Sequence, residues 1–231
     1  VGNFDFSEPG TGTPRNMVFY SSGPGAAIQK VITSGDAAPD SGGAIYTGHW
    51  DASISDAGQI LLDARFGSTK ALMAGSVGSL STVIYEGQTR SEVIPGAVVT
   101  SIPSFALNRS GQLGYLAYLG GSMQAIWFGS AGSETVVLQK DEDGLSGLPA
   151  EASFALLEAM VMNDDGDICV SGTIRPDPMI PAIYDGLTLL LAVGRGDKTH
   201  ASARSPIQAG RPSRRRRAMI RVGSSSPLAA A

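Results

Sequence analysis

One short sequence motif occurs three times in this chain and limits the possible folds more than any other feature. It reads ISDAGQILL at residues 54–62, LNRSGQLGY at 107–115 and MNDDGDICV at 162–170, with the glycines 53 and then 55 residues apart. Each copy begins with an apolar residue, continues with a four-residue Asn/Ser-x-x-Gly turn and ends in alternating apolar residues. A side-chain oxygen at the first turn position can accept from the backbone two residues on, and glycine closes the turn without steric cost. The predicted turn residues are Ser55, Gly58, Asn108, Gly111, Asn163 and Gly166.

The residues after each glycine predict a strand that points alternate side chains into a core. Strand side chains alternate between the two faces, so the second, fourth and sixth residues after the glycine share one face. The apolar residue four positions before each glycine is expected to face inward from the preceding strand, at Ile54, Leu107 and Met162. Each copy therefore predicts a β-hairpin with one buried face. The expected inward positions on the second strands are Ile60, Leu62, Ala64, Leu113, Tyr115, Ala117, Ile168, Val170 and Gly172.

The repeat extends beyond the hairpin to two further apolar runs in each copy. The runs at 83–87, 125–129 and 182–186 share an Ile-aromatic pair and a final glycine, and apolar runs at 92–94, 135–138 and 189–193 follow them. In this alignment residues 74–81 are a Gly/Ser-rich insertion in the first copy. Four short strands in about fifty residues indicate tandem propeller-type units, because a single unit cannot bury its sheet faces.

The fold predicted from these patterns is all-β, with tandem four-stranded antiparallel units in an incomplete β-propeller-like array. The repeat domain spans 1–197, with a half unit at 16–36 and units at about 37–96, 97–143 and 144–197. Because the pattern begins in the middle of a unit, we expect a fragment of a larger protein. Closed propellers have about four to eight blades. Three and a half blades therefore predict truncation, an open array, or self-association that completes it.

Charge divides the chain into an acidic body and a basic tail. Residues 1–197 hold 9 Lys/Arg and 21 Asp/Glu, a net charge of −12, whereas residues 198–231 hold 8 Lys/Arg and no acid. The tail is rich in Ala, Arg and Ser and has too few large apolar residues for a core, which predicts disorder. Its run at 214–217 suggests nucleic-acid binding, an interpretation that isolated basic runs support poorly. Translation of GC-rich DNA out of frame is an alternative origin for this composition. No apolar run approaches the roughly 20 residues of a membrane span.

The repeated turn and strand resemble the NxxGxxAF-type tandem repeat of large secreted or surface-anchored bacterial proteins. The resemblance covers residues 16–197. Two departures are Ser55 in place of Asn in the first copy, and different residues at the Ala-Phe ending. The resemblance implies a propeller-like scaffold outside the cytoplasm and no catalytic residues.

Acidic side chains in the turns are the first candidates for chemistry. Asp164, Asp165 and Asp167 place carboxylates on one short loop, as a calcium site requires. Because this loop is the repeated turn, we favour a turn-forming role for these residues. A propeller-type carbohydrate-active enzyme would instead use scattered acids near the axis, such as Asp51, Asp56 or Asp164. The sequence contains no phosphate loop, no Cys/His metal spacing and no nucleophile elbow.

Three other features have both a structural and a functional interpretation. His49-Trp50-Asp51 is either a loop site that stacks and hydrogen-bonds a sugar, or a strand start at which the Trp packs inward. The single Cys169 is expected to be a structural thiol. The aromatic series in the third strands is interpreted as packing between units rather than as a ligand platform. Its members are Tyr20, Tyr85, Trp127 and Tyr184.

The function predicted from the sequence is a non-enzymatic repeat scaffold of a secreted or cell-surface bacterial protein. Such a scaffold would bind a protein or glycan ligand and use no cofactor. The carbohydrate-active enzyme and nucleic-acid binding through the Arg-rich tail are the alternatives.

Overall fold

The computed structural model describes residues 2–7, 14–142, 153–175, 188–193 and 218–220. In these residues the fold is all-β, with one short 3-10 turn, η1 (Gly120–Ser122), and no α-helix. The strands form one three-stranded and three four-stranded sheets, and within each sheet the strands neighbour one another in chain order. Pairing is antiparallel except between the last two strands. The fold class predicted from the repeat is therefore confirmed as an incomplete propeller-like array.

The four sheets follow the chain in order. The first contains β1 (Gly2–Ser7), β2 (Pro14–Tyr20) and β3 (Gln29–Thr33). The second contains β4 (Gly48–Ile54), β5 (Ile60–Phe66), β6 (Thr69–Gly75) and β7 (Ser81–Tyr85). The third contains β8 (Val99–Leu107), β9 (Leu113–Leu119), β10 (Met123–Gly129) and β11 (Thr135–Gln139). The fourth contains β12 (Ser153–Met162), β13 (Ile168–Arg175), β14 (Thr188–Val193) and β15 (Ala218–Ile220).

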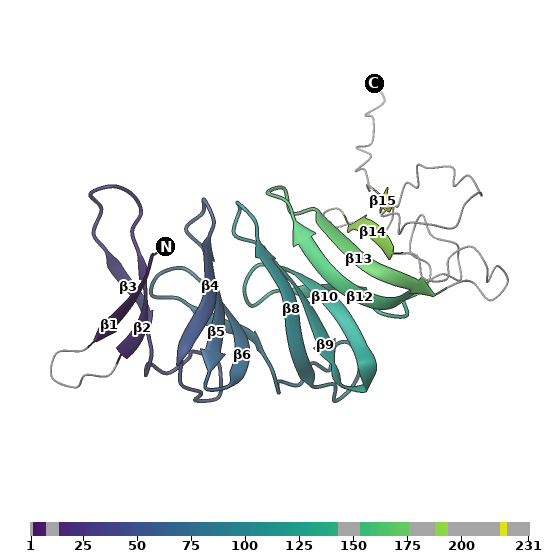
Figure 1. The fold of residues 1–231 in the computed structure, drawn as a ribbon, viewed down its shortest axis with the longest axis horizontal. Coiled ribbons are helices and arrows are strands. Elements are labelled where there is room, and N and C mark those ends of the chain that lie inside the picture. The colour runs from purple at the N-terminus through teal and green to yellow at the C-terminus, as the bar shows by residue number, and fades with distance from the viewer. Residues whose placement is uncertain (1, 8–13, 143–152, 176–187, 194–217, 221–231) are drawn as a thin grey trace, which may run out of the picture.

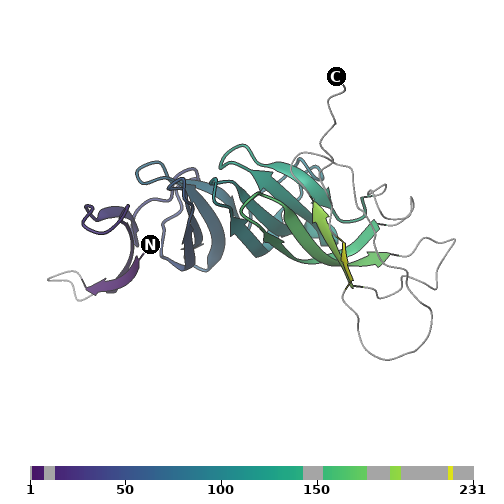
Figure 2. The ribbon, with the colours of Figure 1, turned by 90° about the horizontal axis from the view of Figure 1, so that it is seen from above.

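The sheets stand one after another along the long axis of the molecule and pack face to face (Figure 1, Figure 2). Each apolar core lies between two consecutive sheets. Val18 of the first sheet packs with Ile60 of the second. Leu61 of the second packs with Leu113 of the third, and Leu116 of the third packs with residues of the fourth. A single unit could not bury these faces, so the array is stabilised mainly by contacts between neighbours.

The second strands of the first two hairpins, β5 and β9, are buried on both faces rather than on one. The predicted inward residues of β5, β9 and β13 are all buried, which confirms that part of the pattern. Leu61 and Leu116, on the opposite faces, are 1% and 0% exposed because the next sheet covers them. The expectation that Ile54 points inward is wrong: Ile54 is 38% exposed, at the end of the edge strand β4.

The third and fourth strands of the second sheet differ from the predicted alignment. The run at 83–87, expected as a third strand, falls mostly in the fourth strand β7, and residues 92–94 form no strand. The missed third strand is β6. Its sequence with the following turn, ALMAGSVGS at 71–79, matches AIWFGSAGS at 125–133, so no insertion is needed. The two turns also match, because Ser79 N–H donates to Ser76 O over 3.0 Å and Ser133 N–H donates to Ser130 O over 2.9 Å.

Both ends of the repeat region contain strands that the pattern did not predict. β1 precedes the predicted half unit and pairs with β2. β15 lies within the tail for which disorder was expected and pairs parallel with β14. The apolar run at 189–193 lies beside β13, in the third place of its sheet. The predicted third strand at 182–186, with Tyr184, and the rest of the tail lie outside the described residues.

The three Asn/Ser-x-x-Gly turns share one hydrogen-bond pattern. The N–H of Gly58, Gly111 and Gly166 donates to the carbonyl at the first turn position over 3.0–3.1 Å. The next residue's N–H then donates to the side-chain oxygen at that first position. These distances are 3.1 Å at Ser55, 2.8 Å at Asn108 and 2.7 Å at Asn163. Glycine is required in all three because φ is positive, at 74°, 86° and 88°.

The turns also stack on one another from unit to unit. A Cβ added to Gly111 would come within 2.5 Å of Gln59 Cγ, in the preceding turn. A Cβ on Gly166 would come within 3.2 Å of Asn108 Nδ2, again in the preceding turn. This stacking leaves Asn108 only 2% exposed, whereas Asn163 is exposed because no further described turn covers it.

Candidate functional site

The segment His49-Trp50-Asp51 lies on strand β4 and not on a loop. The β4–β5 register shifts between His49 and Asp51, so Trp50 is the extra residue of a β-bulge. In the described part of the chain β4 is an edge strand, with β5 as its only partner in the sheet. Bulges commonly redirect side chains and blunt edges against unwanted pairing.

Trp50 projects into solvent from this bulge, and the packing interpretation made from the sequence is wrong. Trp50 is 67% exposed, although it is among the largest apolar side chains in the protein. Arg65 of β5 places its guanidinium carbon 4.2 Å from the centre of the indole. A cation over an aromatic face is attracted by the ring quadrupole. Arg65 therefore supports one face of an otherwise open ring.

His49 is held by a buried tyrosine beside the bulge. Tyr46 Oη and His49 Nδ1 are 2.6 Å apart, and Tyr46 is fully buried. Burial lowers the pKa of His49, an effect that the nearby carboxylates of Asp51 and Asp63 oppose. Burial also raises the pKa of Tyr46, so the phenol stays protonated and is able to donate to the imidazole.

Two carboxylates face each other across β4 and β5 at the same level. Asp51 pairs with Asp63 in the strand register. Asp63 is 7% exposed and its Oδ2 lies 3.2 Å from Lys70 Nζ. Burial raises the pKa of Asp63, although Lys70 lowers it in part. Asp51 is exposed, and its Oδ1 accepts from Ala52 N–H over 2.8 Å. The side chains on this face of the sheet form the bulge cluster, which consists of Trp50, Asp51, Asp63, Arg65 and Lys70.

The other predicted acids lie in the stacked turns and bind a common arginine. Arg109 Nε lies 3.0 Å from Asp56 Oδ2, and its Nη2 lies 3.2 Å from Asp164 Oδ2. All three side chains are more than 60% exposed. They occupy the same position in three consecutive turns, so the charges alternate along the stack.

The predicted calcium ligands do not converge on a common point. Asp164 faces Arg109, and Asp167 Oδ2 accepts from Asn163 Nδ2 over 3.0 Å. Asp165 is exposed. Among the described residues, no group of three or more His, Cys, Asp or Glu side chains is placed to hold a metal ion. No described helix is long and apolar enough to cross a bilayer.

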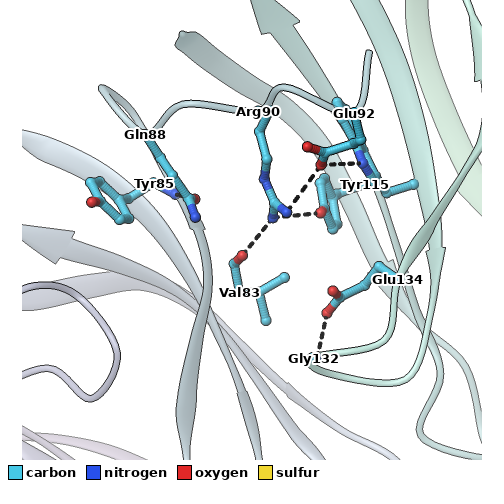
Figure 3. Close-up of polar contacts among 9 residues, drawn as sticks. Val83, Tyr85, Gln88, Arg90, Glu92, Tyr115, Gly132 and Glu134 are labelled. Atoms are coloured by element: carbon cyan, nitrogen blue, oxygen red, sulfur yellow. Dashed lines mark hydrogen bonds and ion pairs between the residues drawn. The ribbon is translucent and has the colours of Figure 1, made fainter. Parts of the chain in front are cut away.

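A second polar cluster joins the second and third sheets through the loop between β7 and β8 (Figure 3). Arg90 of this loop donates to Val83 O over 2.7 Å and to Tyr115 Oη over 3.0 Å. It also forms an ion pair of 3.2 Å with Glu92, which accepts from Trp127 Nε1 over 3.3 Å. Val83 belongs to β7, and Tyr115 and Trp127 belong to β9 and β10. These contacts of Arg90 with Val83, Glu92 and Tyr115, named the Arg90 clasp, therefore connect two units and have a structural role.

The predicted aromatic series does not occupy one equivalent position. Trp127 is 1% exposed and stacks on Tyr115, with ring centres 5.3 Å apart. Tyr85 lies on the fourth strand of its sheet and Tyr20 on the second strand of a three-stranded sheet. Cys169 on β13 is partly buried, and burial raises the pKa of its thiol.

Sequence reasoning found Trp50 and Asp51 but missed the residues that support them. Arg65 and Lys70 carry no local motif. The β4–β5 pairing brings Arg65 beside the bulge, and the β5–β6 pairing adds Lys70. Asp63 had a signal, because it is a charged residue within the apolar run ILLDARF of β5. The contacts of the Arg90 clasp had no such signal in the sequence. The Arg run at 214–217 lies outside the described residues.

The fold and the cluster together define an all-β protein of tandem stacked units with an exposed aromatic site on an edge strand. A model of a family of unknown function, DUF7453, matches residues 3–193. The chain belongs to this family. No curated protein matches the sequence.

Proposed function

We propose that this chain is a non-enzymatic repeat scaffold of a secreted or cell-surface bacterial protein, with a ligand-binding site on the edge strand β4. The observation that carries the proposal is Trp50. An aromatic ring that is 67% exposed and supported by Arg65 at 4.2 Å serves no packing role in the described structure. Exposed aromatic residues with fixed orientation are frequent anchors for ligands and partners.

The placement of the acids favours binding over hydrolysis. A glycosidase needs two carboxyl groups that both reach the substrate. Asp56 and Asp164 are both bound to Arg109, and Asp51 is opposite an Asp63 that is buried and paired with Lys70. The resemblance to secreted tandem repeats supports a location outside the cytoplasm.

Affinity gel electrophoresis with product analysis tests this function. The full chain would be run through native gels containing soluble β-glucan, xylan, mannan, starch, gelatin or fibrinogen. The same polymers would be incubated with the protein and analysed for new reducing ends or peptides. We expect retardation by at least one polymer, without any cleavage. Retardation by none, or cleavage that is lost in Asp51→Asn, would contradict a non-enzymatic binding scaffold.

A further inference from the structure

We infer that the bulge cluster on β4 binds a neutral saccharide ring, with Trp50 as the stacking platform and Asp51 as a hydroxyl acceptor. This inference rests on the proposed binding function and names its site and ligand class. The two components come from successive residues that the bulge presents at one edge of the sheet.

The first component is an apolar face of fixed orientation. Arg65 lies over one side of the Trp50 indole at 4.2 Å, while the residue is 67% exposed. The other side of the ring is therefore available to a flat ligand. The C–H face of a pyranose is apolar and of similar width to an indole. A ring that is already held in place loses little entropy on binding.

The second component is a carboxylate that suits hydroxyls. The exposed Asp51 carboxylate uses one oxygen for Ala52 N–H, and an anionic oxygen accepts strongly from a hydroxyl. His49 pairs with Ala64 and lies on the opposite face of the sheet, toward Tyr46, so the acceptor beside the ring is Asp51. A sugar ring needs this combination of one apolar face and polar groups at its edge.

The surroundings favour a neutral saccharide over an acidic one. The body of the chain, residues 1–197, carries 9 basic and 21 acidic residues, a net charge of −12. Within the cluster, Asp63 is paired with Lys70 at 3.2 Å, and Arg65 is stacked on Trp50. Asp51 is the exposed carboxylate beside the platform, and it would repel uronic or sialic acids.

The surroundings also favour a saccharide over a protein partner. Protein hot spots lie within packed apolar surroundings that exclude water. Around Trp50 the exposed neighbours on β4 are Asp51 and Ser53, and the next exposed large apolar residue is Ile54, at 38%. A lone platform among polar groups suits a small hydroxylated ligand better.

Fluorescence provides a direct test because the chain has two tryptophans in opposite environments. Trp50 is 67% exposed and Trp127 is 1% exposed, so a ligand that stacks on the surface changes the emission of Trp50 alone. The full chain would be titrated with cellohexaose, xylohexaose, mannohexaose and maltohexaose, and with hexagalacturonate as the acidic comparison. We expect a blue shift with at least one neutral hexaose and none with hexagalacturonate.

Calorimetry with the active hexaose would then compare matched variants whose far-ultraviolet spectra are unchanged. Trp50→Ala is expected to weaken binding by about tenfold or more, as loss of an aromatic contact does. Ile28→Ala is the control, because Ile28 is also an exposed large apolar residue, at 73%, and lies just before β3 of another sheet. Asp51→Asn should weaken binding less than Trp50→Ala.

Two results would overturn the inference. The first is unchanged Trp50 emission with every neutral hexaose. The second is an unchanged affinity in Trp50→Ala. If a polymer still retards the Trp50→Ala variant in native gels, the binding scaffold stands and only the site is wrong. If no polymer retards the wild-type chain, the proposed function fails as well.

Discussion

Asn108 and Asn163 make equivalent hydrogen bonds at the same position of two different repeat turns, but they should differ strongly in their contribution to stability. Asn108 is 2% exposed; its Oδ1 accepts from Gln112 N–H over 2.8 Å and its Nδ2 donates to Gln112 Oε1 over 3.0 Å. In Asn108→Ala, the Gln112 amide loses its acceptor in a buried turn. An unsatisfied buried donor costs about 1–3 kcal/mol, and each further lost hydrogen bond costs about 1 kcal/mol. We expect a total loss of about 2–4 kcal/mol.

Asn163 supplies the matched control. Its Oδ1 accepts from Asp167 N–H over 2.7 Å and its Nδ2 donates to Asp167 Oδ2 over 3.0 Å, but the side chain is exposed. Water can replace both bonds in Asn163→Ala, so the cost should be about 0.5–1 kcal/mol. Urea unfolding followed by far-ultraviolet circular dichroism measures both values. Equal losses in the two variants would refute the reasoning that stacking buries the middle turn.

Three further predictions concern other parts of the array. Arg90→Ala should cost about 2–3 kcal/mol in urea unfolding because Val83 O and Tyr115 Oη lose a donor. Arg109→Ala removes two ion pairs whose side chains are more than 60% exposed, so it should cost under about 1 kcal/mol. Similar losses of stability in Arg90→Ala and Arg109→Ala would contradict this difference. Gly172→Ala should cost about 1–3 kcal/mol, because its Cβ would overlap Leu156 O and the Phe154 ring, whereas Gly23→Ala has open space and should change the melting temperature little. A proton NMR titration of His49 should give a midpoint below pH 6.5, since burial lowers its pKa. The stability that comes from keeping His49 neutral is then present above pH 6.5 and is lost as the pH falls through the midpoint. A midpoint above pH 6.5 would contradict the burial.

The repeated turn allowed much of the fold to be predicted from the sequence. Ser55, Asn108 and Asn163 mark turns through local side-chain chemistry, and the apolar residues after each glycine mark strands through their period of two. The aligned strand pairs of the third sheet, at 125–129 and 135–138, fall within the observed β10 and β11. Local patterns of this kind depend on only a few neighbouring residues.

The errors arose where a pattern had two possible registers. The run at 83–87 and the run at 125–129 share an Ile-aromatic pair, so the two were aligned with each other. The structure instead matches 125–129 with 71–75. The shared Gly-Ser-x-Gly-Ser turn identifies the correct register and could have been used. Strand β1 does alternate, with Phe4 and Phe6 between polar residues, but it contains no copy of the repeated turn.

The bulge cluster was beyond sequence reasoning for a different reason. Trp50 looked like a residue that packs at a strand start, because its exposure depends on a register shift in β4. Arg65 reaches it only through pairing between strands, and the same holds for Lys70 beside Asp63. Contacts between residues distant in sequence are not encoded in any local window.

Stacking of the turns is the central claim, and a double-mutant cycle between Gln59 and Gly111 tests it most directly. Gly58→Ala and Gly111→Ala both place alanine at a position where φ is positive, 74° and 86°, which costs about 1–2 kcal/mol. Only Gly111→Ala also drives its Cβ against Gln59 Cγ, at 2.5 Å, whereas the nearest atom to a Cβ at Gly58 is Tyr20 Oη at 3.8 Å. We predict that Gly111→Ala costs more than Gly58→Ala, and that the excess becomes smaller when Gln59→Ala is added, because the Cγ contact is removed. Strictly additive effects of Gln59→Ala and Gly111→Ala would show that the two turns do not touch, and would contradict the stacked array.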